Sequence, residues 1–267
     1  MLLPTTNIRG VEVTRLVVGG NPISGFSHQG PDRTKAMLDY FTMENTKKLL
    51  RDCEAAGINT FFGRADNFVM RLLYEHRNEG GAIQWFAQSA PEHKDAYQNL
   101  AQCRRFGANG VYVHGGEVGR LFEEGKPEEI GAMLKRLQDL GCPVGLAAHD
   151  PQQIEHVERQ GWPVDFYMVC VYNVTSYHGK LGVEGDEKFL DAHRQPALET
   201  CRKVSKPCFA YKILAAGRKH PRDSFPEVFA AIKPTDGVCV GMFPKDDPDI
   251  AEANAELVRE LTVGCGQ

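Results

Sequence analysis

One pattern recurs along this chain: a short apolar run ends in a polar side chain. It is clearest at 110–117, where Gly-Val-Tyr-Val leads into His114 and a pair of glycines. Apolar runs of this length, followed by a turn, are typical of short buried strands. The pattern occurs eight times, at 16–21, 60–64, 85–88, 110–114, 144–149, 166–173, 208–212 and 238–242. The sequence therefore predicts eight buried strands.

Helical segments occupy most of the intervals between these runs. Helices are predicted at about 44–56, 96–105, 127–140, 151–160, 186–204, 223–231 and 248–261. The pair Asp150-Pro151 supplies the N-cap residue and the N1 proline of a helix start. Strands alternating with helices through short loops predict a (β/α)8 TIM barrel. The alternative is a doubly wound open sheet, but no Gly-x-Gly-x-x-Gly follows the first strand to favour it.

Two segments lie outside this regular alternation. Residues 5–15 alternate polar and apolar side chains around Arg9-Gly10, which predicts a β-hairpin that plugs one end of the barrel. Residues 21–43 form a long connection between the first strand and its helix, and we expect it to act as a lid. We expect a single domain over 1–267.

Composition argues against several classes of function. The 267 residues are 42% hydrophobic and 25% charged, so the chain can bury one large core. A net charge of −4 gives no long basic surface for nucleic acid. No apolar run approaches the ~18 residues that would span a membrane, and the start has no secretory signal pattern. The eight cysteines lack CxxC spacing, so we expect reduced, buried thiols in a cytoplasmic protein.

The carboxyl ends of the strands define the expected active site, because catalytic side chains gather at that end of a TIM barrel. The polar residues there are Asn21 and Ser24; Arg64, Asp66 and Asn67; Gln88; His114 and Glu117; His149 and Asp150; Tyr172 and Asn173; Tyr211 and Lys212; and Lys245 after Met242. Such a mouth is suited to proton transfer or to binding a cation.

Several segments, taken in order, carry a resemblance to a known family. They are the opening hairpin with 13–20, then 56–61, 111–114, 164–173, 209–217, and 236–242 with 252–254. Their order resembles the aldo-keto reductase superfamily over nearly the whole chain. The resemblance implies the same barrel, with a nicotinamide cofactor at its mouth and four residues that carry hydride transfer.

Most of those four residues differ here. The family's aspartate falls at 62 or 63, its tyrosine at 67 or 68, and its lysine at Gln88, while its histidine is kept as His114. The Ser-Asn pair that holds the nicotinamide amide is replaced by Ala147-Ala148, although Tyr211 remains at the ring-stacking position. Burying a carboxamide without partners is unfavourable. We therefore expect the reductase fold without ordinary NADP(H) chemistry.

Two histidines at the ends of adjacent strands favour another chemistry. Neighbouring strands lie about 5 Å apart, so His114 and His149 could share a divalent transition metal or a substrate oxygen. Glu117, or else Asp66 or Asp150, would complete the three ligands of a catalytic metal. Each of these has a simpler interpretation: Asp150 as a helix cap, Glu117 as a solvated residue, and His149 as a packed side chain.

Lys212 ends an apolar strand, where desolvation would lower its pKa and make it a base or an imine-forming nucleophile. Strand parity points either Tyr211 or Lys212 inward unless the strand bulges, and the resemblance favours Tyr211. The alternative for Lys212 is a structural salt bridge between strands.

The prediction is an enzyme that acts on a small carbonyl or sugar-like substrate by acid/base or metal-assisted chemistry, as an isomerase, epimerase, lyase or hydrolase. The alternatives are an NADP(H)-dependent reductase with a rebuilt site and a non-catalytic binding barrel. His178 lies in a polar, aromatic segment at 175–186 that we expect to form a flap. The predicted catalytic residues are His114, Tyr211, Lys212, Asp66 and Arg64; the substrate contacts are Asn21, Gln88, Tyr172, Asn173 and His178; and the metal ligands are His114, His149 and Glu117.

Overall fold

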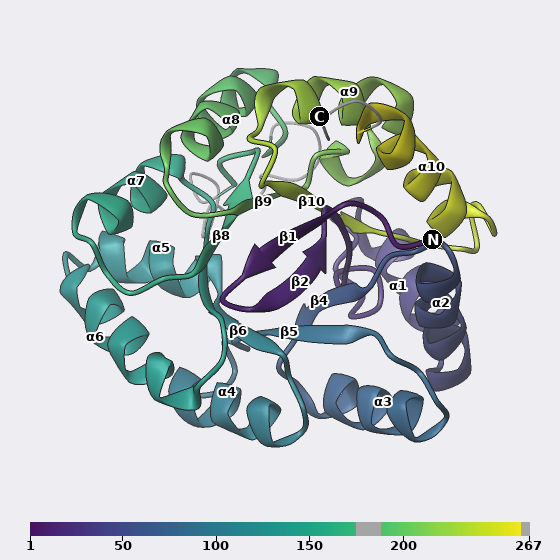
Figure 1. Cartoon of the computed structure of the whole chain (residues 1–267), viewed down its shortest axis with the longest axis horizontal. Helices are drawn as coiled ribbons and strands as arrows, with labels where there is room; N and C mark the ends of the chain where they lie inside the picture. Colours follow the sequence, from purple (N-terminus) through teal and green to yellow (C-terminus); the bar gives the residue numbers. More distant parts are fainter. Residues whose placement is uncertain (175–187, 263–267) are drawn as a thin grey trace.

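Eight parallel strands close into a barrel in the computed structural model, which describes residues 1–174 and 188–262 (Figure 1). The strands follow one another around the barrel in chain order, and the last pairs with the first. The predicted (β/α)8 fold is confirmed. The barrel strands are β3 (Leu16–Gly19), β4 (Thr60–Arg64), β5 (Gln84–Gln88), β6 (Gly110–Val113), β7 (Val144–Ala148), β8 (Phe166–Cys170), β9 (Cys208–Tyr211) and β10 (Gly237–Gly241), preceded by β1 (Thr5–Ile8) and β2 (Val11–Thr14).

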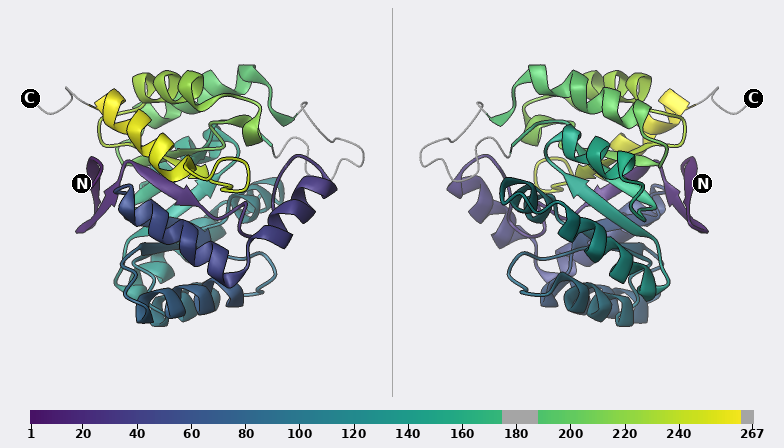
Figure 2. Two further views of the ribbon diagram at one scale, coloured as in Figure 1. Left: turned by 90° about the vertical axis from the view of Figure 1, so that its right-hand side faces the viewer. Right: turned by 90° about the vertical axis from the view of Figure 1, so that its left-hand side faces the viewer.

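Ten α-helices of the described residues surround these strands (Figures 1 and 2). They bury the outward faces of the strands, so most barrel strands are apolar on both faces. The helices are α1 (Pro31–Tyr40), α2 (Met43–Ala55), α3 (Asn67–Asn78), α4 (Ala96–Arg105), α5 (Gly115–Glu123), α6 (Glu128–Leu137), α7 (Pro151–Arg159), α8 (Arg194–Lys203), α9 (Pro221–Ala231) and α10 (Ile250–Thr262).

Four helices differ from the sequence prediction: no range was predicted for α1, α3 or α5, and α8 was predicted to begin earlier than it does. The long connection after β3 contains α1, which has no side-chain cap and buries only Met37, so it leaves a weak hydrophobic pattern in the sequence. This helix lies at the carboxyl end of the barrel, away from the hairpin (Figure 2). The helix predicted from 186 begins only at Arg194, after a 3-10 turn at Asp191–His193. Residues 186 and 187 lie outside the described part of the chain.

The predicted hairpin is formed by β1 and β2, and it covers the amino-terminal end of the barrel (Figure 1). Arg9 and Gly10 at its turn both have positive φ, 48° and 85°, which matches the twist of the paired strands. Ile8 and Val13 pack against the side chains that fill the barrel interior. The hairpin therefore closes this end and leaves the opposite end for the site.

Aromatic rings fill the barrel interior above the hairpin. The ring centroid of Phe62 is 5.0 Å from those of Phe86 and Phe209, and 5.8 Å from that of Phe166. Glycine on a neighbouring strand makes room for these rings: a Cβ atom on Gly145 would lie 2.3 Å from the Phe166 ring. Alternating large and small residues thus pack the interior without a pore.

The cysteines of the described residues are all free, and only Cys239 is more than slightly exposed. Burial raises the pKa of the Cys103 and Cys239 thiols to about 12, so both stay protonated at neutral pH. Within the described residues, no helix has the length and apolarity needed to cross a membrane.

We predict that Gly145→Ala lowers the free energy of unfolding by about 2 kcal/mol, because the added methyl would overlap the Phe166 ring. Phe86 and Tyr112 pack against that ring and prevent it from moving aside. Urea denaturation measures the change. Adding Phe166→Leu should remove the overlap. The double variant should therefore lose less free energy of unfolding than the sum of the losses in the two single variants. Strictly additive effects would contradict this account of the interior.

Candidate active site

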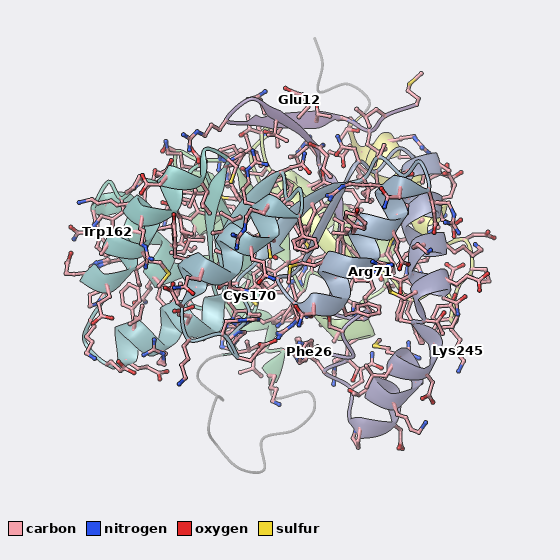
Figure 3. The ribbon with its side chains drawn as sticks, turned by 90° about the horizontal axis from the view of Figure 1, so that it is seen from below. Glu12, Phe26, Arg71, Trp162, Cys170 and Lys245 are labelled. Carbon is pink, nitrogen blue, oxygen red and sulfur yellow. The ribbon has the colours of Figure 1, made fainter. Side chains whose placement is uncertain are left out.

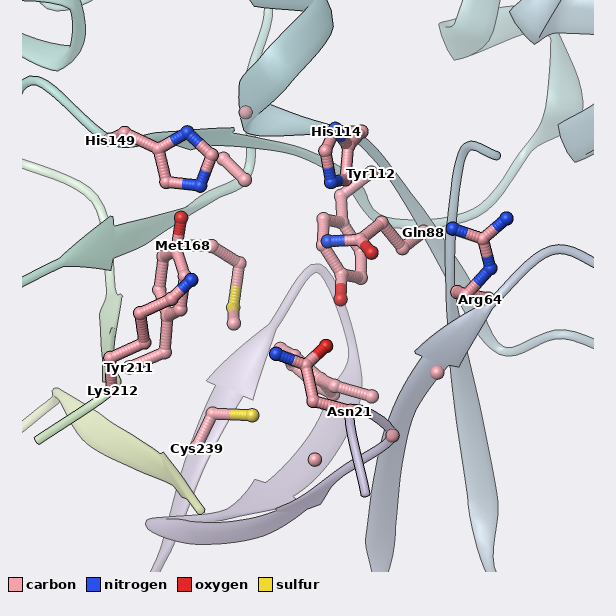
Figure 4. Close-up of a pocket in the computed structure, with 16 residues that line it drawn as sticks. Asn21, Arg64, Gln88, Tyr112, His114, His149, Met168, Tyr211, Lys212 and Cys239 are labelled. Carbon is pink, nitrogen blue, oxygen red and sulfur yellow. The ribbon is translucent and has the colours of Figure 1, made fainter. Parts of the chain in front are cut away.

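A pocket opens at the carboxyl end of the barrel, opposite the hairpin. Figure 3 shows the two ends, with Glu12 on the hairpin and Phe26 at the mouth. An inner cavity of about 100 Å³ continues into an outer chamber of about 300 Å³, which is room for a small molecule. Its walls carry Asn21, Arg64, Gln88, His114, His149, Tyr211, Lys212 and Cys239, above a floor of Phe62, Tyr112, Ala147 and Met168 (Figure 4).

His114 connects β6 to α5 and caps that helix. Its Nδ1 accepts the backbone N–H of Gly116 at 3.0 Å, so in the neutral ring the proton is on Nε2. A Cβ atom on Gly116 would lie 3.0 Å from the imidazole, so glycine at this position lets the ring fold back over the helix start. His114 lines the pocket.

His149, after β7, lies between His114 and Tyr211. Its ring centroid is 6.2 Å from each of theirs, and the two imidazoles are nearly perpendicular at 79°. Its side chain is only 6% exposed. The predicted meeting of the two histidines at adjacent strand ends therefore occurs, with the tyrosine alongside.

The structure brings two of the three predicted metal ligands, His114 and His149, together without Glu117. Among the described residues, no group of three His, Cys, Asp or Glu side chains could hold a metal ion. Glu117 lies in the first turn of α5, where burial raises its pKa, and it does not line the pocket. Asp150 caps α7 by accepting the N–H of Gln152 at 2.9 Å, which is the simpler interpretation given to it.

Asp66 also acts on local structure and does not line the pocket, although it was predicted as catalytic. It caps α3 by accepting the N–H of Val69 at 2.9 Å, and it accepts Nε of Arg64 at 3.3 Å. The Nη2 of Arg64 donates to Glu92, and this bond lowers the pKa of that carboxyl. The guanidinium, 5.3 Å from the Phe26 ring centroid, is therefore fixed at the rim of the pocket.

Tyr211 and Lys212 both line the pocket, although a regular strand would point only one of them inward. Lys212 resolves the conflict because its φ of 61° places it in the left-handed region, directly after β9 ends. Its Nζ lies 5.5 Å from the Tyr211 ring centroid (Figure 4). Burial lowers the pKa of Lys212 and raises that of Tyr211 well above its usual range.

Arg194, which the sequence analysis did not single out, holds this turn in place. It is 3% exposed, and its Nη1 donates to the carbonyl oxygen of Ile213 and to the Tyr172 hydroxyl, both at 2.9 Å. Ser224 donates to the same carbonyl at 2.7 Å. Three segments distant in sequence thus meet at the residue after Lys212. No local motif marks such a meeting, so sequence reasoning could not find it.

The predicted substrate contacts have different positions. Asn21 and Gln88 line the pocket as predicted. Tyr172 is buried against Arg194, and neither it nor Asn173 lines the pocket. His178 lies outside the described residues. The outer chamber adds side chains that sequence reasoning missed, on loops rather than strand ends: Phe26, His28, Pro91, Val174 and Lys188.

No family model matches the chain, and a comparison with curated proteins finds no match. Solved structures match it over nearly its full length. A truncated 3-deoxy-D-arabino-heptulosonate 7-phosphate synthase from Thermotoga maritima is 14% identical, with a TM-score of 0.56 over 98% of this chain and 92% of that one. The N-acetylneuraminic acid (sialic acid) synthetase from Leptospira borgpetersenii is 10% identical, with a TM-score of 0.52 over 100% and 92%.

The dihydropteroate synthase of Yersinia pestis is 8% identical, with a TM-score of 0.51 over 98% of this chain and 99% of that one. At such low identities these matches show the barrel fold alone. None of the three is an aldo-keto reductase, so membership in that superfamily stays a prediction.

We predict that Lys212→Gly is more stable than Lys212→Ala by about 1 kcal/mol, because glycine adopts positive φ without the clash that a Cβ atom causes. Both changes remove the amine, so the difference between their free energies of unfolding reports the cost of the positive φ at this position. Guanidinium denaturation measures it. Lys35, exposed within α1, is the matched control, and there glycine should be the less stable of the two by about 1 kcal/mol. If the glycine variant were less stable than the alanine variant at both positions, the backbone at Lys212 would not be strained.

Proposed function

We propose that this chain is an aldo-keto-reductase-like barrel enzyme that acts on a small carbonyl or sugar-like substrate, with Lys212 as its reactive amine. The observation that carries the proposal is the placement of Lys212 beside Tyr211 and the two histidines in one pocket. Burial favours the neutral amine, which is the form that attacks a carbonyl or removes a proton.

The chemistry that follows is imine formation. Nζ of Lys212 adds to the carbonyl carbon, and the substrate oxygen takes up protons and leaves as water, which gives the C=N bond. The protonated imine then draws electrons from a neighbouring C–H or C–C bond. Loss of the α proton and its return accounts for an isomerase or epimerase, while C–C cleavage accounts for a lyase.

The neighbouring side chains have matching roles. His114 presents its Nε2 proton to the substrate oxygen, which assists its departure as water. Tyr211 is protonated at neutral pH, and burial raises its pKa further, so its hydroxyl serves as a donor. His149, between the two, is placed to accept a proton. Asn21 and Gln88 offer neutral donors and acceptors, which suit substrate hydroxyl groups.

The described residues do not fit a nicotinamide cofactor. The positions that would clamp its amide carry Ala147 and Ala148, whose methyl side chains offer neither a hydrogen-bond donor nor an acceptor, and Ala147 lines the pocket floor. The proposed reaction therefore has no step that uses NADP(H). It also has no step through a divalent metal, since the described residues give His114 and His149 no third ligand. The reduced cysteines favour the cytoplasm as its location.

We predict that sodium borohydride, added with dihydroxyacetone, fixes the substrate carbons on Lys212 as a secondary amine. Peptide mass spectrometry locates the adduct. Lys212→Arg should abolish it, and Lys245→Arg, at an exposed lysine outside the pocket, should leave it unchanged. If Lys212 acts as a base without forming an imine, nothing will be trapped. The protein will then still exchange the substrate's α protons with D₂O, and Lys212→Arg will abolish this exchange. A protein that shows neither effect would contradict the proposed function.

A further inference from the structure

The walls of the pocket are strongly basic. Of the described residues that line the two chambers, the charged ones are Arg64, Lys188 and Lys212, joined by three histidines, and none is Asp or Glu. The whole chain carries a net charge of −4, so the positive charge of the pocket walls is opposite in sign to that of the chain as a whole. A recess with one sign of charge attracts a ligand of the opposite sign.

Lys188 and Lys212 both line the outer chamber. After burial, the charge of Lys188 contributes to the lowered pKa of Lys212, which places the two amines within electrostatic reach. Neither forms an ion pair with a described residue, whereas Lys47, Lys48 and Lys233 elsewhere in the chain each do. The charge of half-buried Lys188 therefore has no carboxylate partner among the described residues, and a bound anion would supply one.

Arg64 adds a guanidinium at the same rim, where it is ion-paired with Asp66 and Glu92. Its Nε and Nη2 donate to Asp66 and Glu92, and its guanidinium stacks on Phe26. These contacts orient the group, and no described residue accepts a hydrogen bond from its Nη1. The amino terminus of α5, at Gly115, adds its partial positive charge to the inner cavity.

We propose that the substrate carries an anionic group, a carboxylate or a phosphate, which Lys188 and Arg64 bind in the outer chamber while its carbonyl carbon meets Lys212 in the inner cavity. The inference rests on the proposed function for the role of Lys212 and extends it by naming the class of substrate. The size of the two chambers fits this division, since the inner cavity of about 100 Å³ holds a carbonyl group and the outer chamber of about 300 Å³ holds the charged end.

The test compares borohydride trapping at Lys212 for matched pairs of carbonyl compounds. Dihydroxyacetone phosphate is compared with dihydroxyacetone, and pyruvate with hydroxyacetone. We expect the anionic member of at least one pair to reach half-maximal labelling at a concentration roughly tenfold lower, since a hydrogen bond to a charged group contributes about that much. For each pair, the ratio of the neutral to the anionic compound's half-maximal concentration is calculated. A larger ratio for the dihydroxyacetone pair indicates a phosphate, and a larger ratio for the pyruvate pair indicates a carboxylate.

Lys188→Gln should reduce that ratio roughly tenfold, whereas Lys245→Gln, which removes the same charge at an exposed site outside the pocket, should preserve it. Circular dichroism checks that both variants fold. Equal labelling by anionic and neutral members would overturn the inference, although trapping itself would still support the proposed function.

Direct binding separates the two proposals if nothing is trapped. Calorimetric titration with inorganic phosphate and with oxalate reports the anion site without any chemistry at Lys212. Binding that Lys188→Gln weakens and Lys245→Gln preserves would support the anion site even if the imine step fails. Absence of binding by either anion would overturn the inference.

Discussion

The left-handed backbone at Lys212 is the constraint on which the site depends. A side chain in this conformation costs about 1 kcal/mol, and the structure meets that cost through the hydrogen bonds that Arg194 and Ser224 donate to the next carbonyl. The result is that Tyr211 and Lys212, consecutive in sequence, enter the same pocket. A regular strand would have delivered only one of them.

The rest of the barrel supplies the environment that makes this lysine reactive. Phe62 and the rings around it fill the interior beneath the pocket, and the hairpin seals the far end. Lys212 lines the pocket above this packing, where burial desolvates its amine. Stability and chemistry are linked at this point, because the packing that holds the barrel together also lowers the lysine's pKa.

Sequence reasoning predicted the parts that depend on local pattern. Strands, hairpin and most helices follow from periodicity and turn residues, and the strand-end rule placed His114 and His149 together. It could not predict Arg194 or Lys188, because their roles depend on segments that meet only in the folded chain. It also predicted Asp66 as a catalytic residue. In the structure the Asp66 carboxylate caps α3 and orients Arg64. The sequence alone does not distinguish this capping role from a catalytic one.

The most direct test of this account is the pH at which the amine of Lys212 becomes reactive. Brief labelling with acetic anhydride over a pH series, read by peptide mass spectrometry, follows the neutral form of each lysine. An unperturbed lysine titrates near pH ~10.4. Because burial lowers its pKa, Lys212 should reach half its maximal labelling at a lower pH than the lysine of a short reference peptide added to the same sample. Equal midpoints would show that the pocket does not desolvate Lys212 and would contradict the proposed chemistry.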